Sequence, residues 1–240
     1  MGYAVVTGAS SGLGRSLSVE LARRKIPLVL VARNAAALSA LASDLARCYK
    51  IQAIPVPLDL SDPAAVPQLT RKLAELDKPV DILVSNAGSC ERSPFLASKR
   101  SAPSLRLMVN SATELARAVL PGMADRKRGR VLFVGSLMSA AGTGPGVAQY
   151  AASKAYLATF ARSLAKEMEP HGVGVTLTSP GAIRSGFFDS MDGDALCNRI
   201  PFYPMSPEAV ADRSVRAMVA GLTEVMPGWQ NRALAAGTPF

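Results

Sequence analysis

The stretch Thr7-Gly8-Ala9-Ser10-Ser11-Gly12-Leu13-Gly14 decides the fold, because it joins a short apolar segment to an amphipathic one. Before it, Tyr3–Val6 is predicted as a buried strand. After it, apolar residues recur from Leu13 at helical spacing. Glycines allow a tight turn and let backbone N–H groups approach a phosphate, to which the helix N-terminus adds a partial positive charge. The turn therefore predicts a phosphate-binding site, formed by Gly8, Ser10, Ser11, Gly12, Leu13 and Gly14.

Short apolar runs alternate with helical patterns along the chain. Further strands are predicted at 27–31, 51–58, 80–84, 131–134, 173–177 and 224–226. Continuous Val, Ile and Leu strands separated by helices indicate a parallel sheet that is covered on both faces. Because there is no internal boundary or repeat, we predict a single domain over residues 1–240. The expected fold is α/β, a doubly wound Rossmann fold with a mostly parallel seven-stranded sheet and helices on both faces, and it binds its ligand at the carboxyl ends of the strands.

Polar residues and prolines predict where several helices begin. Asn34 is expected to cap one helix, and Asp62, with Pro63 at the first helical position, is expected to cap another. Ser206 followed by Pro207 predicts a third helix start. Two long helices are predicted at about 104–123, interrupted near Pro121, and at about 149–169.

The composition excludes several classes of protein and of site. Apolar residues make up 49% of the 240 residues and charged residues 19%, which is typical of a globular protein and not of a coiled coil or a disordered chain. His171 is the only histidine, so a zinc site that needs two or more histidines is excluded. The three cysteines, Cys48, Cys90 and Cys197, are widely spaced and form no C-x-x-C motif, so we expect reduced thiols, no disulfide framework and no metal site.

The formal net charge of +9 raises the possibility of a nucleic-acid or membrane partner. The basic residues are scattered, however, and the one dense run, Arg126–Arg130, is interpreted as a solvated turn. Aromatic residues are 5% of the chain, too few for a base-stacking surface, so we expect no nucleic-acid partner. No apolar run is long enough for a transmembrane segment, and the first strand leaves no room for a signal peptide. We expect a cytoplasmic protein, although a targeting segment removed earlier would leave no trace in this sequence.

The end of the second strand bears on the choice of nucleotide. A domain that prefers NAD places Asp or Glu there to hold the ribose 2′-hydroxyl. This chain has Ala32-Arg33-Asn34 at that point and no acid. A guanidinium matches a 2′-phosphate in charge and in its forked donors, so Arg33 favours NADP (NADPH), with Arg15 as a second positive charge. The alternative is that Arg33 is only a surface residue.

Two short motifs follow the third and fourth strands. Asn86-Ala87-Gly88 combines a side chain that can bond backbone groups with small residues that leave room for a ring system. Asp59-Leu60 holds the corresponding place after the third strand. Because both motifs fall at the carboxyl ends of strands, we assign Asp59, Leu60, Asn86, Ala87 and Gly88 to the cofactor site.

The motif Tyr150-Ala151-Ala152-Ser153-Lys154 lies early in a predicted helix. Positions i and i+4 share one helix face, and an ammonium beside a phenol favours the phenolate and lowers the pKa of the tyrosine. A tyrosine with a lowered pKa can serve as a general acid or base. The alternative is a surface tyrosine beside a solvated lysine.

Together these motifs resemble those of the short-chain dehydrogenase/reductase family, and the resemblance extends from Val5 to about Gly228. It implies that Tyr150 is the proton donor and that Lys154 binds the nicotinamide ribose and lowers the pKa of the tyrosine. It also implies that Asn110 supports a water relay to Lys154. The residues expected to line the nicotinamide are Pro180, Gly181, Ile183 and Ser185, the last of which replaces the threonine of the family pattern.

The catalytic serine of this family follows the fifth strand, where this chain has Val134-Gly135-Ser136. Ser136 lies 14 residues before Tyr150, one more than the family pattern, whereas Ser139 lies 11 residues before it. We assign Ser136, with one extra residue in the loop Gly142–Gly146, because Ser136 directly follows the strand.

The resemblance, to ketoacyl- and steroid-type reductases in particular, implies hydride transfer between NADP(H) and a ketone, an aldehyde or a secondary alcohol. The apolar residues of the expected substrate loop, about 184–205, favour a hydrophobic substrate. The long helices at 104–123 and 149–169 form the subunit interface in most relatives, so a homodimer or homotetramer is expected. The alternative for the loop is that it only packs on the core. The alternatives for the function are a catalytically weak NADP-binding sensor or scaffold of the same fold, which the odd serine–tyrosine spacing favours, and a nucleic-acid binder.

Overall fold

A computed structural model describes residues 1–90, 94–98, 101–139, 145–184 and 204–237. Its centre is a seven-stranded sheet in the order β3-β2-β1-β4-β5-β6-β7, in which all the pairings are parallel. This confirms the predicted α/β Rossmann-like fold. The strands are β1 (Tyr3–Thr7), β2 (Leu28–Ala32), β3 (Ala53–Pro57), β4 (Val80–Ser85), β5 (Gly129–Val134), β6 (Val173–Thr178) and β7 (Glu224–Val225).

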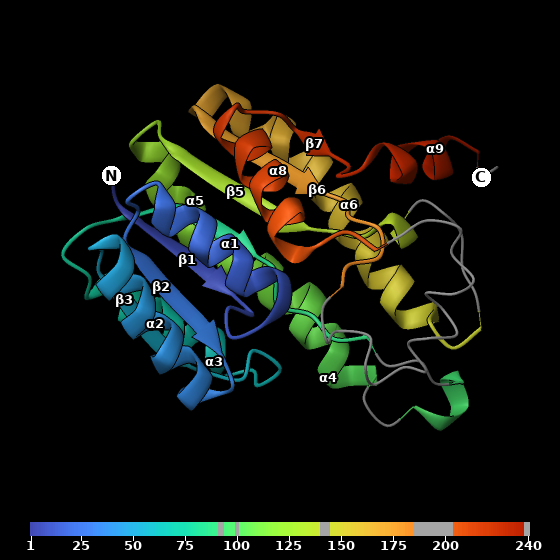
Figure 1. Cartoon of the computed structure of the whole chain (residues 1–240), viewed down its shortest axis with the longest axis horizontal. Coiled ribbons are helices and arrows are strands. Elements are labelled where there is room, and N and C mark those ends of the chain that lie inside the picture. The colour runs from blue at the N-terminus through green and yellow to red at the C-terminus, as the bar shows by residue number, and fades with distance from the viewer. Residues whose placement is uncertain (91–93, 99–100, 140–144, 185–203, 238–240) are drawn as a thin grey trace.

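The chain builds the sheet outward in two directions from its middle. It runs from β1 to β2 and β3 on one side, and then returns to β4 and continues through β5 and β6 to β7 on the other (Figure 1). The direction of winding therefore changes between β1 and β4. In an open parallel sheet this switch point leaves a crevice at the carboxyl ends of the strands, where ligands bind.

Helices cover both faces of the sheet (Figure 1). The helices of one face are α1 (Gly12–Arg23), α2 (Ala35–Tyr49) and α8 (Pro207–Val219). Those of the other face are α3 (Ala65–Ala74), α5 (Ser111–Asp125) and α6 (Ala148–Met168). The remaining helical elements are η1 (Phe95–Ala97), α4 (Ser101–Leu105), η2 (Arg106–Asn110), η3 (Leu137–Ser139), η4 (Glu169–His171) and α9 (Trp229–Gly237).

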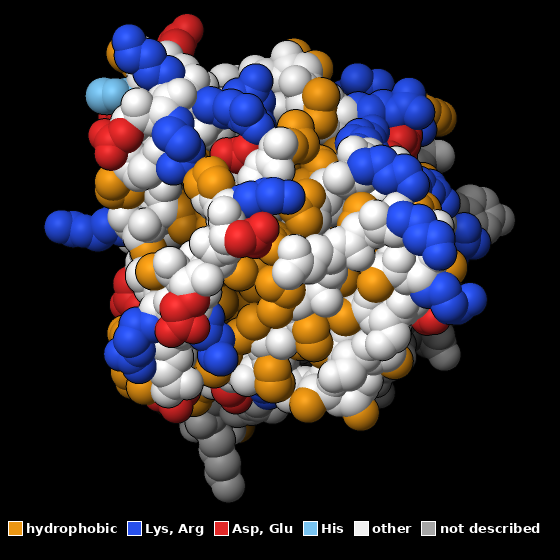
Figure 2. All heavy atoms as spheres, turned by 90° about the vertical axis from the view of Figure 1, so that its left-hand side faces the viewer, with side chains coloured by type: hydrophobic (Ala, Val, Ile, Leu, Met, Phe, Trp, Pro, Cys, Tyr) orange, Lys and Arg blue, Asp and Glu red, His pale blue; other side chains and the backbone are white. Residues whose placement is uncertain are grey.

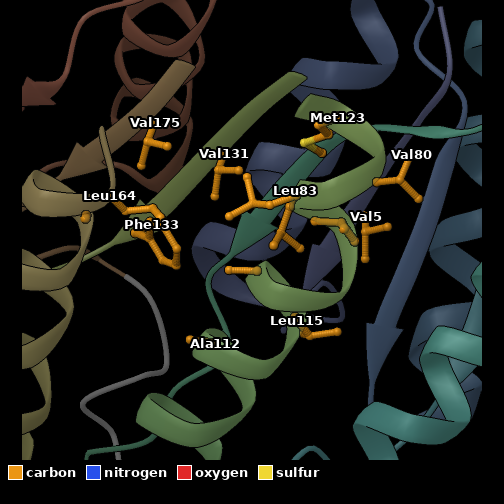
Figure 3. Packing of buried hydrophobic residues seen from close by; sticks show 14 of the residues in the cluster. Val5, Val80, Leu83, Ala112, Leu115, Met123, Val131, Phe133, Leu164 and Val175 are labelled. Carbon is orange, nitrogen blue, oxygen red and sulfur yellow. The ribbon is translucent and has the colours of Figure 1, made fainter. Parts of the chain in front are cut away.

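Successive strand residues belong to opposite cores, as the alternation of side chains along a strand requires. In β1, Val5 belongs to the core beneath α3, α5 and α6, whereas Ala4 and Val6 belong to the core beneath α1, α2 and α8. Figure 3 shows the first core, in which strand residues such as Leu83 and Phe133 belong to one cluster with Leu115 of α5. Because both faces of every central strand are buried, the strands are continuously apolar.

Two of the three predicted helix starts are confirmed. The Asn34 side chain accepts a hydrogen bond from Ala37 N at 3.0 Å, and the Ser206 side chain accepts one from Ala209 N at 3.2 Å. The prediction for Asp62 is wrong, because α3 begins at Ala65. Asp62 instead closes a turn before the helix by accepting from Ala64 N at 2.9 Å. Aspartate stabilises such turns as readily as it caps helices.

The expected interruption near Pro121 is also wrong. Pro121 lies inside α5, which continues to Asp125. Leu120 and Met123 are buried against the sheet on either side of it, so tertiary packing holds the helix together there. The irregularity lies earlier, where Arg106–Asn110 form a π-helical turn between α4 and α5.

The basic run 126–130 does more than form a solvated turn. Arg128 Nη2 lies 2.6 Å from Asp81 Oδ2, and Arg126 donates to Val80 O at 2.9 Å. The same carboxylate accepts from Gly2 N at 2.6 Å, so the run secures the amino-terminal ends of β1 and β4. Figure 2 shows the side of the molecule on the left of Figure 1, where basic side chains are interspersed with acidic and apolar ones. None of the described helices has the length and apolar run that a bilayer-spanning helix needs.

Candidate active site

A cleft of about 1110 Å³ opens at the carboxyl ends of the strands, at the switch point of the sheet. It is lined by the turns that follow β1, β2, β3, β4, β5 and β6, together with one face of α6. These turns are far apart in the sequence and meet only because the strands are parallel. The predicted site residues that line it are Gly8, Ser10, Ser11, Gly12, Leu13, Gly14, Arg33, Asp59, Leu60, Asn86, Ala87, Gly88, Ser136, Tyr150, Lys154, Pro180, Gly181 and Ile183.

The glycine-rich turn has the geometry of an anion cradle. Gly8 and Gly12 adopt φ values of 66° and 50°, and α1 begins at Gly12, so its N-terminal N–H groups face the cleft. A Cβ on Gly14 would lie closer than 3.0 Å to the Gly8 carbonyl oxygen and to the Asn86 side chain. The turn can therefore close only around glycines, and its shape and dipole fit a pyrophosphate.

Asn86 fastens the turn after β4 to the turn after β1. Its Nδ2 donates to Thr7 O at 2.9 Å, and its backbone N–H donates to Thr7 Oγ1 at 3.0 Å. Ala87 N donates to the same hydroxyl at 3.0 Å. These bonds fix the two turns relative to each other, so the cleft wall is formed before any ligand enters.

Arg33 lies at the end of β2 on the rim of the cleft, with its side chain 63% exposed. Its Nη1 is 4.0 Å from Asp59 Oδ2 of the neighbouring turn, while Asp59 Oδ1 accepts hydrogen bonds from Ser61. An exposed pair at this distance is weak, so the guanidinium can turn toward an anion in the cleft. Arg15 is exposed on the first turns of α1.

Lys154 is fully buried, and its Nζ donates to Val134 O at 2.7 Å and lies 5.8 Å from the centre of the Tyr150 ring. Burial lowers the pKa of Lys154 from 10.5 to about 8. The helix spacing and the strand end together hold the ammonium between β5 and the tyrosine. The predicted Tyr150–Lys154 pair is therefore brought together in the structure, and not as a surface pair.

The electrostatics of Tyr150 differ from the expectation. Burial raises the pKa of Tyr150 from 10.0 to about 12, a hydrogen bond from Ser136 lowers it, and the nearby Cys90 raises it. The expected lowering by Lys154 is not among the causes of this shift, and desolvation disfavours the phenolate more than the Ser136 hydrogen bond favours it. At neutral pH Tyr150 is a protonated phenol.

Of the two candidate serines, Ser136 is the one that meets Tyr150. It is buried, lines the cleft and forms a hydrogen bond with the Tyr150 side chain. Ser139 lies in the following turn, where its hydroxyl donates to Ser136 O at 2.6 Å. Residues 140–144, which hold most of the loop with the expected extra residue, lie outside the described part of the chain.

The structure places Asn110 outside the cleft lining. It is exposed at the end of the π-helical turn and is not among the described residues that line the cleft. Two residues earlier, Met108 is buried in a small cluster with Cys90, Val147 and Tyr150. The helix therefore contributes a buried thioether to the cluster that contains Tyr150.

Sequence reasoning missed four further residues of the cleft wall near Tyr150. Ser89, Cys90, Ser104 and Leu107 line this part, and the Ser89 and Ser104 hydroxyls are 3.0 Å apart. Their nearness to the Asn86-Ala87-Gly88 motif was the one available signal for Ser89 and Cys90. Ser185 and the segment 185–203 lie outside the described residues. Within the described ranges, no group of three or more His, Cys, Asp or Glu side chains could hold a metal ion.

A comparison with known protein families identifies the family to which the chain belongs. The profile of the family described as short chain dehydrogenase matches residues 2–195. The chain belongs to this family. Membership agrees with the architecture, since the matched part contains the glycine-rich turn, the switch point of the sheet and the Tyr150–Lys154 pair.

Several curated proteins of this family are similar to the chain. An uncharacterized oxidoreductase of Myxococcus xanthus is 34% identical over 95% of this chain and 87% of its own length. A very-long-chain 3-oxoacyl-CoA reductase of Laccaria bicolor is 35% identical over 72% of this chain and 52% of its own length. The human inactive hydroxysteroid dehydrogenase-like protein 1 is 34% identical over 74% of this chain and 54% of its own length. The chain thus spans about half the length of the last two relatives.

Solved structures of the family share the fold. A short-chain dehydrogenase from Sphingobium yanoikuyae in complex with NADPH superposes with a TM-score of 0.86 at 27% identity, over 95% of this chain and 89% of that one. A bulky-bulky ketone specific alcohol dehydrogenase from Comamonas testosteroni gives a TM-score of 0.81 at 26% identity, over 95% and 86% of the two chains.

Proposed function

We propose that this protein is an NADP(H)-dependent oxidoreductase that interconverts a hydrophobic ketone or aldehyde with its secondary or primary alcohol. The observation that carries the proposal is the position of Ser136, Tyr150 and Lys154, which line the same cleft as the glycine-rich turn. The turn that would bind the dinucleotide and the tyrosine that would donate the proton thus line the same cleft. NADPH binding by the similar Sphingobium yanoikuyae enzyme supports this reading.

The residues of the cleft fit a dinucleotide. The turn Gly8–Gly14 and the N-terminus of α1 would hold the pyrophosphate, and Asn86, Ala87 and Gly88 would face the adenosine side of the cofactor. Arg33, with Arg15 nearby on α1, would bind a 2′-phosphate, which is why we propose NADP(H) over NAD(H). The nicotinamide supplies the hydride when the cofactor is bound.

The side chains at the other end of the cleft supply the proton and hold the carbonyl. The Ser136 and Tyr150 hydroxyls would donate hydrogen bonds to the carbonyl oxygen, stabilising the negative charge that develops on it. Because its pKa is raised to about 12, Tyr150 is protonated at neutral pH and can give its proton to the alkoxide. Lys154 would stabilise the phenolate that remains, since its ammonium is held beside the ring by Val134 O.

The apolar part of the wall next to Tyr150 supports an apolar substrate, and the Ser89 and Ser104 hydroxyls that also line it are bonded to each other. Leu107 and Cys90 line it, Met108 lies buried behind them, and Met138 packs against that cluster. The thiol of Cys90 is neutral, because burial raises its pKa to about 11. We also propose that the chain folds as one domain and forms a homodimer or homotetramer through α5 and α6. The exposed Tyr156 of α6 stacks on Phe160 and bonds to Thr113 of α5, which gives that face an aromatic patch.

The cofactor proposal is tested by thermal unfolding of wild type, Arg33→Ala and Arg47→Ala with NADPH or NADH. Arg47 is an exposed, ion-paired arginine of α2 away from the cleft, and serves as the matched control. At about a hundred times its dissociation constant, a ligand stabilises the native state by roughly 2.7 kcal/mol. We expect NADPH to stabilise wild type and Arg47→Ala more than NADH does, and Arg33→Ala to lose that difference. If neither nucleotide raises the transition temperature of wild type, the dinucleotide site is refuted.

A second candidate function is nucleotide binding without turnover. It is favoured by the exposure of Asn110 and by the place that Met108 takes beside Tyr150. The similarity to a human relative named as inactive points the same way. The two functions separate in one assay, because a sensor would bind NADPH and oxidise it with none of a panel of aromatic, steroid and long-chain ketones.

A further inference from the structure

The turn Pro180–Ile183 at the carboxyl end of β6 forms the cleft wall beside Ser136. Pro180, Gly181 and Ile183 all line the cleft. On one side the turn is bonded to the serine's own loop, because Leu137 N donates to Pro180 O at 2.8 Å. A shift of this turn therefore changes the width of the cleft and the position of Ser136 together.

On its other side the turn rests on α9, which lies beyond the carboxyl ends of β6 and β7 (Figure 1). A Cβ on Gly181 would lie closer than 3.0 Å to Cγ, Oδ1 and Nδ2 of Asn231. The whole carboxamide of Asn231 thus fills the space that any other residue at 181 would need. Asn231 is 8% exposed, and its Nδ2 donates to Pro227 O at 2.6 Å, so its side chain is fixed in place.

The same carboxamide touches the base of the expected substrate loop. Ile183 and Met205 form a parallel bridge, in which Arg184 N donates to Met205 O at 2.9 Å and Met205 N donates to Ala182 O at 3.0 Å. Asn231 Nδ2 lies 4.0 Å from Met205 Sδ. One buried side chain of α9 therefore contacts both the cleft wall and the point where the chain returns from the loop.

We propose that Asn231 is a positioning residue for the reaction. It sets the Pro180–Ile183 wall against Ser136 and holds the base of the loop, so that the C-terminal helix controls how tightly the cofactor and the carbonyl fit at Tyr150. This inference rests on the proposed function, and it extends the site to an element that lies outside the matched family region of residues 2–195.

The test is a double-mutant cycle between positions 181 and 231 in the full chain. Gly181→Ala forces a methyl group into the carboxamide, and Asn231→Ala leaves a space that this methyl can fill. We expect each single variant to weaken NADPH binding by about tenfold and to lower kcat with the best carbonyl of the panel. The Gly181→Ala/Asn231→Ala double variant should recover most of the loss of Gly181→Ala, a non-additivity expected of residues in contact. Arg232→Ala, an exposed neighbour on the same helix, is the control.

NADPH affinity can be followed by energy transfer from Trp229, the one tryptophan of the chain, which all these variants keep. Transition temperatures are measured in parallel, because a purely structural role would lower stability and leave the dissociation constant and kcat of the folded protein unchanged. Additive single effects, or a stability loss alone, overturn the positioning role. If wild type itself gives neither energy transfer nor a thermal shift with NADPH, the proposed function fails; if wild type binds and the variants match it, only the inference about Asn231 fails.

Discussion

The two ends of the cleft are built in different ways. The cofactor end, formed by the Thr7–Gly14 turn and Asn86, is defined by backbone: positive φ values, a helix N-terminus and hydrogen bonds to Thr7. The reaction end, formed by Cys90, Met108, Ser136, Tyr150 and Lys154, is defined by buried side chains, and in three of them, Cys90, Tyr150 and Lys154, burial moves the pKa far from its ordinary value. A backbone site tolerates almost no added atom, whereas a side-chain site can be retuned by substitution. This contrast predicts that variants at the cofactor end lower NADPH affinity and stability, whereas variants at the reaction end lower kcat.

The largest effect is expected from Tyr150→Phe. Removing the hydroxyl removes both the proton donor and one hydrogen bond to the developing alkoxide, while the ring keeps its packing. We expect kcat to fall by roughly 10²- to 10⁴-fold with NADPH affinity within about twofold of wild type. Tyr156→Phe, which alters an exposed tyrosine of the same helix, is the control and should keep its activity. Loss of NADPH binding in Tyr150→Phe would contradict the separation of the two ends.

The next effect is expected from Gly14→Ala at the cofactor end. Its Cβ would crowd the Gly8 carbonyl and the Asn86 side chain, so the turn must open or the helix must shift. Overpacking of this kind costs about 1–3 kcal/mol, and we expect both a lower transition temperature and at least tenfold weaker NADPH binding. Gly122→Ala in α5 faces only the guanidinium of Arg126, far from the cleft, and should leave NADPH binding near wild type. Unchanged NADPH binding by Gly14→Ala would show that the turn does not cradle the nucleotide.

The buried ammonium gives a smaller, pH-dependent effect. The pKa of Lys154 is about 8 in the folded chain and near 10.5 when unfolded, so between these values the unfolded state binds more protons. The contribution of this group to the free energy of unfolding therefore rises as pH increases from about 8 to 10.5. Lys154→Met lacks this titration. As the pH rises from about 8 to 10.5, the transition temperature of wild type should therefore increase relative to that of Lys154→Met. A constant difference would mean that Lys154 is not buried as described.

The smallest effect is expected from Cys90→Ala. The thiol lines the reaction end but supplies no proton at neutral pH, so its loss removes only one sulfur atom from the wall. We expect kcat/KM for an apolar ketone to change by about three- to tenfold, with the dissociation constant of NADPH unchanged. The exposed Cys48→Ala is the matched control. A change in NADPH affinity as large as the change in kcat/KM would place Cys90 at the cofactor end.

The sequence predicts the cofactor end of the cleft better than the reaction end. The Thr7–Gly14 turn, Asn86 and the Tyr150–Lys154 pair are local motifs, and parallel strands bring such motifs to one edge whatever the detailed packing. The Val-Asn pattern is local, so it does not show that Asn110 is exposed or that Met108 is buried in the cluster with Tyr150, since both depend on how α4 and α5 pack. The raised pKa of Tyr150 could not be predicted either, since spacing shows a neighbouring lysine but not the burial that is the largest cause of the shift. Asn231 was missed because its partner Gly181 is distant in sequence.

The bridge between Ile183 and Met205 bears on how the chain tolerates a change in length between these two residues. Ile183 and Met205 are bonded to each other, so the two ends of the intervening stretch are held together. The hydrogen bonds of the bridge offset part of the entropic cost of holding them there. Lengthening a segment between fixed ends costs little, about 0.6 kcal/mol for each doubling. A change in the length of the stretch between these residues is therefore expected to cost little in closure entropy. A graft at this junction would test whether the stretch sets substrate preference.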